Sequence, residues 1–145
     1  MAKTNELEAA YRATGYRVFL PGGCFDLRID APCAALADWM ETAGVGCFAI
    51  VTACNPGSQR LTAGQNAEVQ AALECDLLDG NYEPYAGENI PDDAGWPSEE
   101  SCFVPDLELE DALALAADYG QNAIVWGAAD GVPRLAWTAT EGGEK

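Results

Sequence analysis

The chain has 145 residues, 49% of them hydrophobic, which is enough to build one core without a metal or a disulfide framework. Its 24 acidic and 7 basic residues leave a formal net charge of −17, which disfavours nucleic acid and anionic membrane surfaces as partners. It contains no histidine, so a Ser-His-Asp triad and an imidazole base are excluded.

The excess charge lies in one part of the chain. Residues 61–133 hold 16 acidic residues and no Lys or Arg, whereas residues 1–60 are nearly neutral. Such a segment forms either a solvated acidic face or a surface for a basic protein partner. Residues 1–16 do not resemble a signal peptide, and no apolar run is long enough to span a bilayer, so we expect a cytoplasmic protein.

Metal and cofactor motifs are absent. The six cysteines include no C-x-x-C pair, and neither G-x-x-x-x-G-K-[ST] nor G-x-G-x-x-G occurs. We therefore expect no metal site and no cofactor, and interpret most cysteines as small buried residues. Cys54, at the end of an expected strand, is the candidate for a reactive thiol.

The N-terminal part predicts a helix, a hairpin and a second helix. Apolar spacing favours a helix over residues 5–14. Residues 16–20 and 24–30 are typical of strands joined by the Pro-Gly-Gly turn at 21–23. A second helix is expected over 32–44, with proline in its first turn and glycine at its end.

The middle of the chain predicts the central strand. Residues 47–53 are apolar on both faces, as in a strand covered on both sides. A turn follows at 55–58. Thr62 and Gln65 have the spacing of a capping box, which predicts a helix that ends at Gly80.

The acidic part predicts a short strand, a long loop, a strand and a helix. We expect an edge strand over 81–86, because it contains a proline, and then a loop over 87–100. A short strand is expected over 101–104. Asp106 is the expected cap of a helix over 107–119.

The C-terminal part predicts a last hairpin. Strands over 123–127 and 134–138 are joined by a turn with Asp-Gly at 130–131. The expected fold is α/β (α+β), a single mixed β-sheet flanked by helices in the order α-β-β-α-β-α-β-β-α-β-β. We expect one domain over 1–140 and a disordered tail over 141–145.

Polar residues adjoin the ends of the two most apolar strands. If strand 123–127 runs antiparallel to strand 47–53, four of these residues share one end of the sheet: Thr52, Asn55, Gln121 and Asn122. If the two strands are parallel, these residues are separated. The candidate ligand-binding residues at and around this end are Thr52, Asn55, Ser58, Asn66, Trp96, Glu99, Gln121, Asn122 and Arg134. Without histidine, acid–base work in an enzyme falls to carboxylates, Cys or Tyr, and Glu99 is the candidate catalytic residue.

Each candidate also has a structural explanation. Asn55 can form an Asx turn with the following proline, and Gln121 and Asn122 can cap the preceding helix. Trp96 can cover the core, and Glu99 can pair with an arginine.

The motifs around these residues resemble an uncharacterised bacterial family catalogued as domain of unknown function 3293. The resemblance covers residues 8–136 and rests on A-Y-R-A-T-G-Y (10–16), T-A-C-N-P-G-S (52–58), Asn66, W-P-S-E-E-S (96–101), G-Q-N-A (120–123) and Arg134-Leu135. The chain departs from the family at Cys54, where Trp is frequent, and at Gly64-Gln65, where Ala-Glu is frequent. The resemblance implies a bacterial origin and brings no established activity.

Three functional hypotheses follow. The first is a binding or regulatory module, in which side-chain amides recognise a small polar ligand or a peptide, because amides offer paired donors and acceptors. The second is a small enzyme that uses Glu99 as acid or base, Asn55 and Asn122 to polarise a substrate, and Arg134 to hold an anion. The third is an acidic decoy for a basic protein surface.

Overall fold

The computed structural model describes residues 2–55, 60–92, 95 and 98–138, with side chains from Glu6 onward. This part forms four helices and seven strands in the predicted order. The helices are α1 (Ala2–Arg12), α2 (Ala34–Ala43), α3 (Ala63–Asp79) and α4 (Leu109–Asp118). The strands are β1 (Thr14–Leu20), β2 (Gly23–Leu27), β3 (Cys47–Val51), β4 (Tyr85–Pro91), β5 (Glu99–Pro105), β6 (Ala123–Ala128) and β7 (Arg134–Trp137).

The seven strands form one sheet in the order β2-β1-β4-β5-β3-β6-β7. Every neighbouring pair is antiparallel. Hairpins supply the pairs β1–β2, β4–β5 and β6–β7, and β3 lies between β5 and β6 with the opposite direction to both. The predicted class, α+β with one sheet flanked by helices, is confirmed, and the pairing expected to be mixed is antiparallel throughout.

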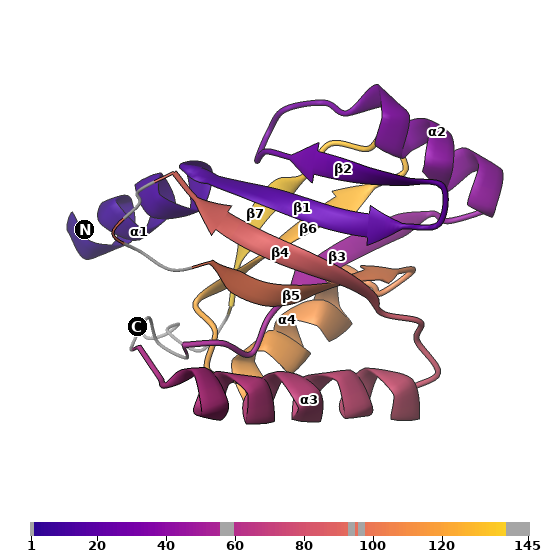
Figure 1. Ribbon diagram of the computed structural model, residues 1–145. Coiled ribbons are helices and arrows are strands. Elements are labelled where there is room, and N and C mark those ends of the chain that lie inside the picture. The colour runs from indigo at the N-terminus through magenta and orange to yellow at the C-terminus, as the bar shows by residue number, and fades with distance from the viewer. Residues whose placement is uncertain (1, 56–59, 93–94, 96–97, 139–145) are drawn as a thin grey trace.

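The sheet curls around its inner face (Figure 1). Asp30, beyond β2, donates its backbone N–H to the carbonyl oxygen of Pro133, just before β7, at 2.6 Å. Leu27 of β2 and Leu135 of β7 belong to the same apolar cluster, although these strands are the two edges of the sheet. The face that carries this cluster is therefore concave.

Helices cover both faces of the sheet (Figure 1). α3 and α4 pack against one face through a cluster that includes Leu73, Leu77 and Ala112. On the concave face, α2 covers one end through Leu36 and Met40, whereas α1 lies at the other end. Because β3 is buried at every position by these two layers, the prediction of a central strand is confirmed.

The two ends of the concave face are filled differently. At the α2 end the rings of Phe48 and Phe103 stack with centroids 5.0 Å apart, and Trp39 contacts Phe103 edge to face. These large side chains fill the space that the curl encloses. Towards α1 this face carries smaller or polar residues, such as Thr52 after β3 and Ala123 in β6, and the space remains hollow.

Within residues 81–100 a strand is present as predicted, but its bounds and its place at an edge are wrong. β4 begins at Tyr85 and lies between β1 and β5, so it is no edge strand, and residues 87–91 pair with β1 instead of forming a loop. A β-carbon at Gly87 would lie 2.9 Å from Ser101 Oγ and 3.0 Å from the Arg17 carbonyl oxygen. This glycine, which suggested a loop, is required by a close approach of neighbouring strands.

Several helix boundaries also differ from the prediction. α1 ends at Arg12, so Thr14 opens β1 and does not close the helix. The N-cap of α4 is Glu108, and Asp106 instead accepts a hydrogen bond from the Gly46 N–H at 2.9 Å. The capping box of Thr62 and Gln65 is present as predicted. No helix in the described residues has the length and apolar character needed to cross a bilayer.

Candidate functional site

The concave face contains a cavity of about 680 Å³ at its α1 end. It is lined by α1 on one side and by the ends of β1, β3, β4, β5 and β6 on the other. The polar lining residues that carry the arguments below are Tyr11, Tyr16, Asn55, Asn89, Glu99 and Asn122. Leu7, Ile50 and Val125 supply an apolar wall. This volume and mixed lining are typical of a small-molecule site.

Three polar residues form a row across neighbouring strands. Asn89 in β4 lies directly opposite Tyr16 in β1 and opposite Glu99 in β5. Residues that face each other in antiparallel strands point to the same side of the sheet. The phenol, the amide and the carboxylate therefore share the concave face.

Asn89 carries a polar atom without a partner. Its Oδ1 is buried and has no hydrogen-bond donor. Ser101 Oγ, in the next row of the same face, is the second such atom among the described residues. Buried acceptors without donors are rare in folded proteins and call for an explanation.

Asn55 holds the Glu99 carboxylate, and Asn66 holds Asn55 in turn. Asn55 Nδ2 donates to Glu99 Oε2 at 2.7 Å, and Asn55 Oδ1 accepts from the Leu61 N–H and from Asn66 Nδ2 at 2.8 and 3.0 Å. Asn66 Oδ1 in turn accepts from the Asn55 N–H at 2.9 Å. Asn55 has φ of 48°, a left-handed conformation that asparagine tolerates better than most residues. These amides therefore position Glu99 and the chain around it.

The strand ends meet as the antiparallel interpretation predicts. β3 and β6 pair antiparallel, and Gln121 Nε2 donates to the Cys54 carbonyl oxygen at 3.1 Å. The Thr52 hydroxyl donates to the Glu100 carbonyl oxygen at 2.6 Å. Thr52, Asn55, Glu99, Gln121 and Asn122 all line the cavity.

Other predicted site residues lie elsewhere. Asn66 lines a smaller cavity of about 330 Å³, which shares Cys54, Asn55 and Glu99 with the larger one. Arg134 forms an ion pair with Asp130 at 3.1 Å and does not line either cavity, because β7 is the sheet edge beyond β6. Ser58 and Trp96, like the tail 141–145, are outside the described residues.

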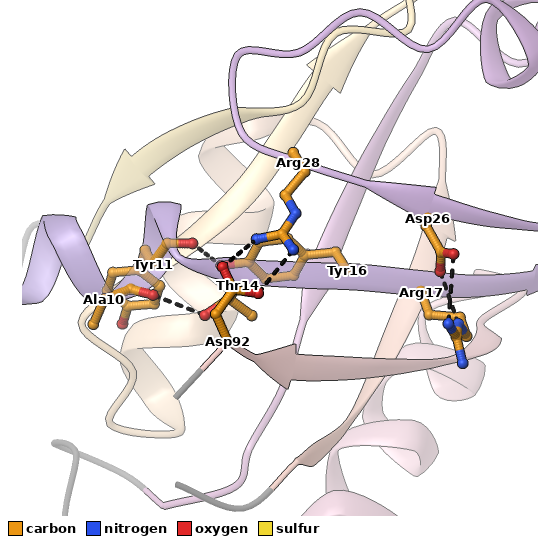
Figure 2. Close-up of polar contacts among 8 residues, drawn as sticks. All are labelled: Ala10, Tyr11, Thr14, Tyr16, Arg17, Asp26, Arg28 and Asp92. Atoms are coloured by element: carbon orange, nitrogen blue, oxygen red, sulfur yellow. Dashed lines mark hydrogen bonds and ion pairs between the residues drawn. The ribbon is translucent and has the colours of Figure 1, made fainter. Parts of the chain in front are cut away.

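The lining residues that the sequence prediction missed include Tyr11, Tyr16 and Asn89. The Tyr16 hydroxyl donates to the Tyr11 carbonyl oxygen at 3.1 Å, and the Thr14 hydroxyl donates to the Ala10 carbonyl oxygen at 2.8 Å (Figure 2). These bonds fix the end of α1 to β1. Both tyrosines lie in the A-Y-R-A-T-G-Y motif, and this motif was the sequence signal that could have identified them as site residues.

Burial dominates the electrostatics of these phenols. Desolvation raises the pKa of Tyr11 to about 12, and the charge of Glu99 adds to this effect. Burial, followed by the neighbouring Tyr11, also raises the pKa of Tyr16. Both phenols are therefore neutral at physiological pH and can act as hydrogen-bond donors.

Cys54 does not have the environment of a reactive thiol. Its side chain is buried, and desolvation raises the pKa of the thiol. Because the thiolate is the nucleophile, this environment disfavours reaction. Among the described residues, no group of three or more Cys, Asp and Glu could hold a metal ion.

The described part of the cavity lining carries negative charge. Its lining includes Glu6 and Glu99 and, within the described residues, no Lys or Arg. A bound anion would lie beside the Glu99 carboxylate, which has the same sign of charge. The lining therefore favours a neutral or cationic group over an anion.

A family model described as protein of unknown function (DUF3293) matches residues 51–124, about half of the chain. The matched segment runs from the end of β3 to the start of β6 and includes Asn55, Asn89, Glu99 and Gln121. No curated protein and no solved structure matches the chain.

Proposed function

We propose, for a chain that belongs to the DUF3293 family, that the concave-face cavity is a binding site for a small polar ligand. The observation that carries the proposal is the buried Asn89 Oδ1, an acceptor without a donor in the wall of a cavity of about 680 Å³. A bound ligand that donates a hydrogen bond there would satisfy this atom.

The roles of the amides in this proposal differ from the first hypothesis. Asn55, Asn66 and Gln121 hydrogen-bond to neighbouring parts of the chain, so they shape the site. Direct recognition then falls first to Asn89, whose Oδ1 has no donor. This division is typical of sites in which a few polar groups orient a ligand against an apolar wall.

The enzyme alternative is favoured by one contact, the bond from Asn55 to the Glu99 carboxylate inside the cavity. That hypothesis uses Arg134 to hold an anion, but Arg134 pairs with Asp130 away from the cavity. Exposed carboxylates on α3 and α4, such as Glu74, Asp76 and Asp111, agree with the acidic-decoy hypothesis but identify no partner. Ligand binding is therefore the function with the strongest support.

We also propose that this function is carried out in the bacterial cytoplasm. All six cysteines are unpaired thiols, and disulfides are rare in reducing compartments. Cell fractionation of the source organism would test this location.

A thermal-shift screen against metabolites tests the binding proposal, because a ligand that binds the native state raises the melting temperature. Each hit is repeated with Asn89→Leu, which removes the acceptor while keeping a similar size, and with Arg134→Ala as a control outside the cavity. We expect the shift to be lost in the first variant and kept in the second. Hits that shift both variants equally would place the ligand elsewhere and refute the proposal.

A further inference from the structure

We infer, building on the proposed function, that the ligand is a neutral amide whose N–H donates to Asn89 Oδ1 and whose carbonyl oxygen accepts from the Tyr11 hydroxyl. The apolar part of the ligand packs against the wall that Leu7, Ile50 and Val125 form. Two polar groups of opposite hydrogen-bonding character, in the lining of one cavity, lead to this assignment.

Asn89 supplies the acceptor. Its Oδ1 is buried and has no hydrogen-bond donor. Since an amide oxygen only accepts hydrogen bonds, the ligand has to bring an N–H or O–H group. A ligand without such a group would leave a buried acceptor unsatisfied and would bind more weakly.

Tyr11 supplies the donor. Its phenol is neutral at physiological pH, because desolvation raises its pKa to about 12. The backbone N–H of Ala123 interacts with the phenol oxygen, and the Tyr11 carbonyl oxygen accepts from the Tyr16 hydroxyl at 3.1 Å. Both contacts use acceptor positions of Tyr11. Among the described residues none accepts a hydrogen bond from the Tyr11 hydroxyl, so its hydrogen can bind a ligand carbonyl.

The donor and the acceptor lie around the same carboxylate. Asn89 is the direct partner of Glu99 in the β4–β5 register, and the charge of Glu99 contributes to the raised pKa of Tyr11. Tyr16 also connects the two, because it lies opposite Asn89 in β1 and its hydroxyl donates to Tyr11. An amide carries its N–H and its carbonyl oxygen on opposite sides of one planar group. It can therefore lie between a donor and an acceptor.

A neutral group matches this pair better than a charged one. Glu99 already has partners, Asn55 Nδ2 at 2.7 Å among them, so we assign it to the framework of the site. Asn89 Oδ1 is an uncharged acceptor, which offsets little of the cost of removing an ammonium group from water. A carboxylate ligand would lie beside Glu99, which has the same sign of charge.

Four compounds of nearly the same shape serve as probes. The amide is 3-phenylpropanamide, whose phenyl group can bury apolar surface against Leu7, Ile50 and Val125. The ketone 4-phenylbutan-2-one keeps the carbonyl and replaces the amide nitrogen by a methyl group. The anion 3-phenylpropanoate and the cation 3-phenylpropylammonium supply the two charged alternatives.

Titration calorimetry of the four probes with the whole protein tests the inference. We expect the amide to bind at least about five-fold more tightly than the ketone, because only the amide satisfies Asn89 Oδ1. Both charged probes should bind more weakly than the amide.

Two variants separate the two contacts. Asn89→Leu removes the acceptor, so the amide should bind no more tightly than the ketone. Tyr11→Phe removes the hydroxyl and keeps the ring, so amide and ketone should weaken by the same factor, roughly two- to ten-fold, and their ratio should persist. Arg134→Ala, outside the cavity, should behave as the wild type. If melting curves show that Asn89→Leu does not fold, the ratio in the wild type and the Tyr11→Phe variant decide the result.

The amide assignment is wrong if the ketone binds as tightly as the amide, or if a charged probe binds more tightly. It is also wrong if Asn89→Leu keeps the preference for the amide, if Tyr11→Phe changes no affinity, or if none of the four probes binds. In each of these cases the metabolite screen with Asn89→Leu still decides whether the cavity is a ligand site.

Discussion

Gln121 Nε2 lies 3.1 Å from the carbonyl oxygen of Cys54, and this hydrogen bond joins the start of β6 to the segment that follows β3. Both residues are buried, with 8% and 4% of their surface exposed. The bond therefore satisfies a carbonyl group that water does not readily reach. It also fixes one wall of the cavity, to which both residues contribute.

Replacement of Gln121 by leucine should lower the free energy of unfolding by about 1–3 kcal/mol, because the buried Cys54 carbonyl loses its donor. Gln121→Glu should cost more, since it places a carboxylate oxygen against that carbonyl. Urea unfolding followed by tryptophan fluorescence measures both. Equal stability of the Glu variant and the wild type would show that the bond is not formed.

Asn55 combines a left-handed backbone with several side-chain hydrogen bonds, and two substitutions separate these features. Asn55→Gly keeps the backbone conformation and removes the amide. Asn55→Ala removes the amide and adds roughly 1–2 kcal/mol of backbone strain. We expect the order of stability wild type, Gly variant, Ala variant in chemical denaturation. An alanine variant as stable as the glycine variant would contradict the positive φ.

Local signals in the sequence were sufficient for much of the fold. The apolar run over 47–53 predicted the buried β3, and Thr62 with Gln65 predicted the start of α3. The meeting of Asn55 and Gln121 followed from a single assumption about strand direction, which the β3–β6 pairing satisfies. These features depend on residues close in the chain or on one pairing.

The site depended on pairings that local patterns do not encode. Tyr16 and Asn89 meet because β1 pairs with β4, which is more than 60 residues away in the chain. Gly87 and the acidic residue after it have low strand propensity, so the segment was predicted as a loop. Tertiary pairing on both sides outweighs that propensity. Asn89, the residue on which the proposed function depends, lies in this segment.

Arg28 and Asp92 form a bidentate ion pair, with distances of 2.8 and 3.0 Å (Figure 2). The hydrogen bonds from Arg28 lower the pKa of Asp92 below its ordinary value of 3.8. A lowered folded-state pKa contributes stability at pH values above the unfolded-state pKa, and this contribution is lost as the pH falls through the folded-state pKa.

The stability of the whole protein depends on pH for several reasons, because many carboxylates lose their charge on acidification. Comparison of the wild type with Asp92→Asn isolates the contribution of this ion pair. The stability difference between wild type and variant should be constant from pH 7 to about 5 and shrink as the pH falls below about 4. Since the pair is exposed, high salt should reduce the difference at neutral pH. A difference that persists unchanged at pH 2 would rule out the ion pair as its source.

Two glycines provide a matched test of the packing on the concave face. A β-carbon at Gly127 would lie 2.4 Å from Phe48 Cε2 and 2.9 Å from the Val132 carbonyl oxygen, whereas one at Gly64 in α3 would meet nothing within 4 Å. Phe48 is fully buried and stacks on Phe103, so the ring has no free space to enter. Gly127→Ala should therefore destabilise the protein by about 1–3 kcal/mol, as overpacked cores do.

Gly64→Ala should instead stabilise the protein by about 0.5–1 kcal/mol, because alanine reduces the entropy of the unfolded chain and favours the helix. Guanidinium unfolding of both variants gives the two values, and the double variant should show their sum because the sites are far apart in the fold. A Gly127→Ala variant as stable as the wild type would mean that Phe48 can move. Phe48 fills the α2 end of the concave face. If its ring can move, the aromatic cluster does not fix the size of the cavity at the α1 end.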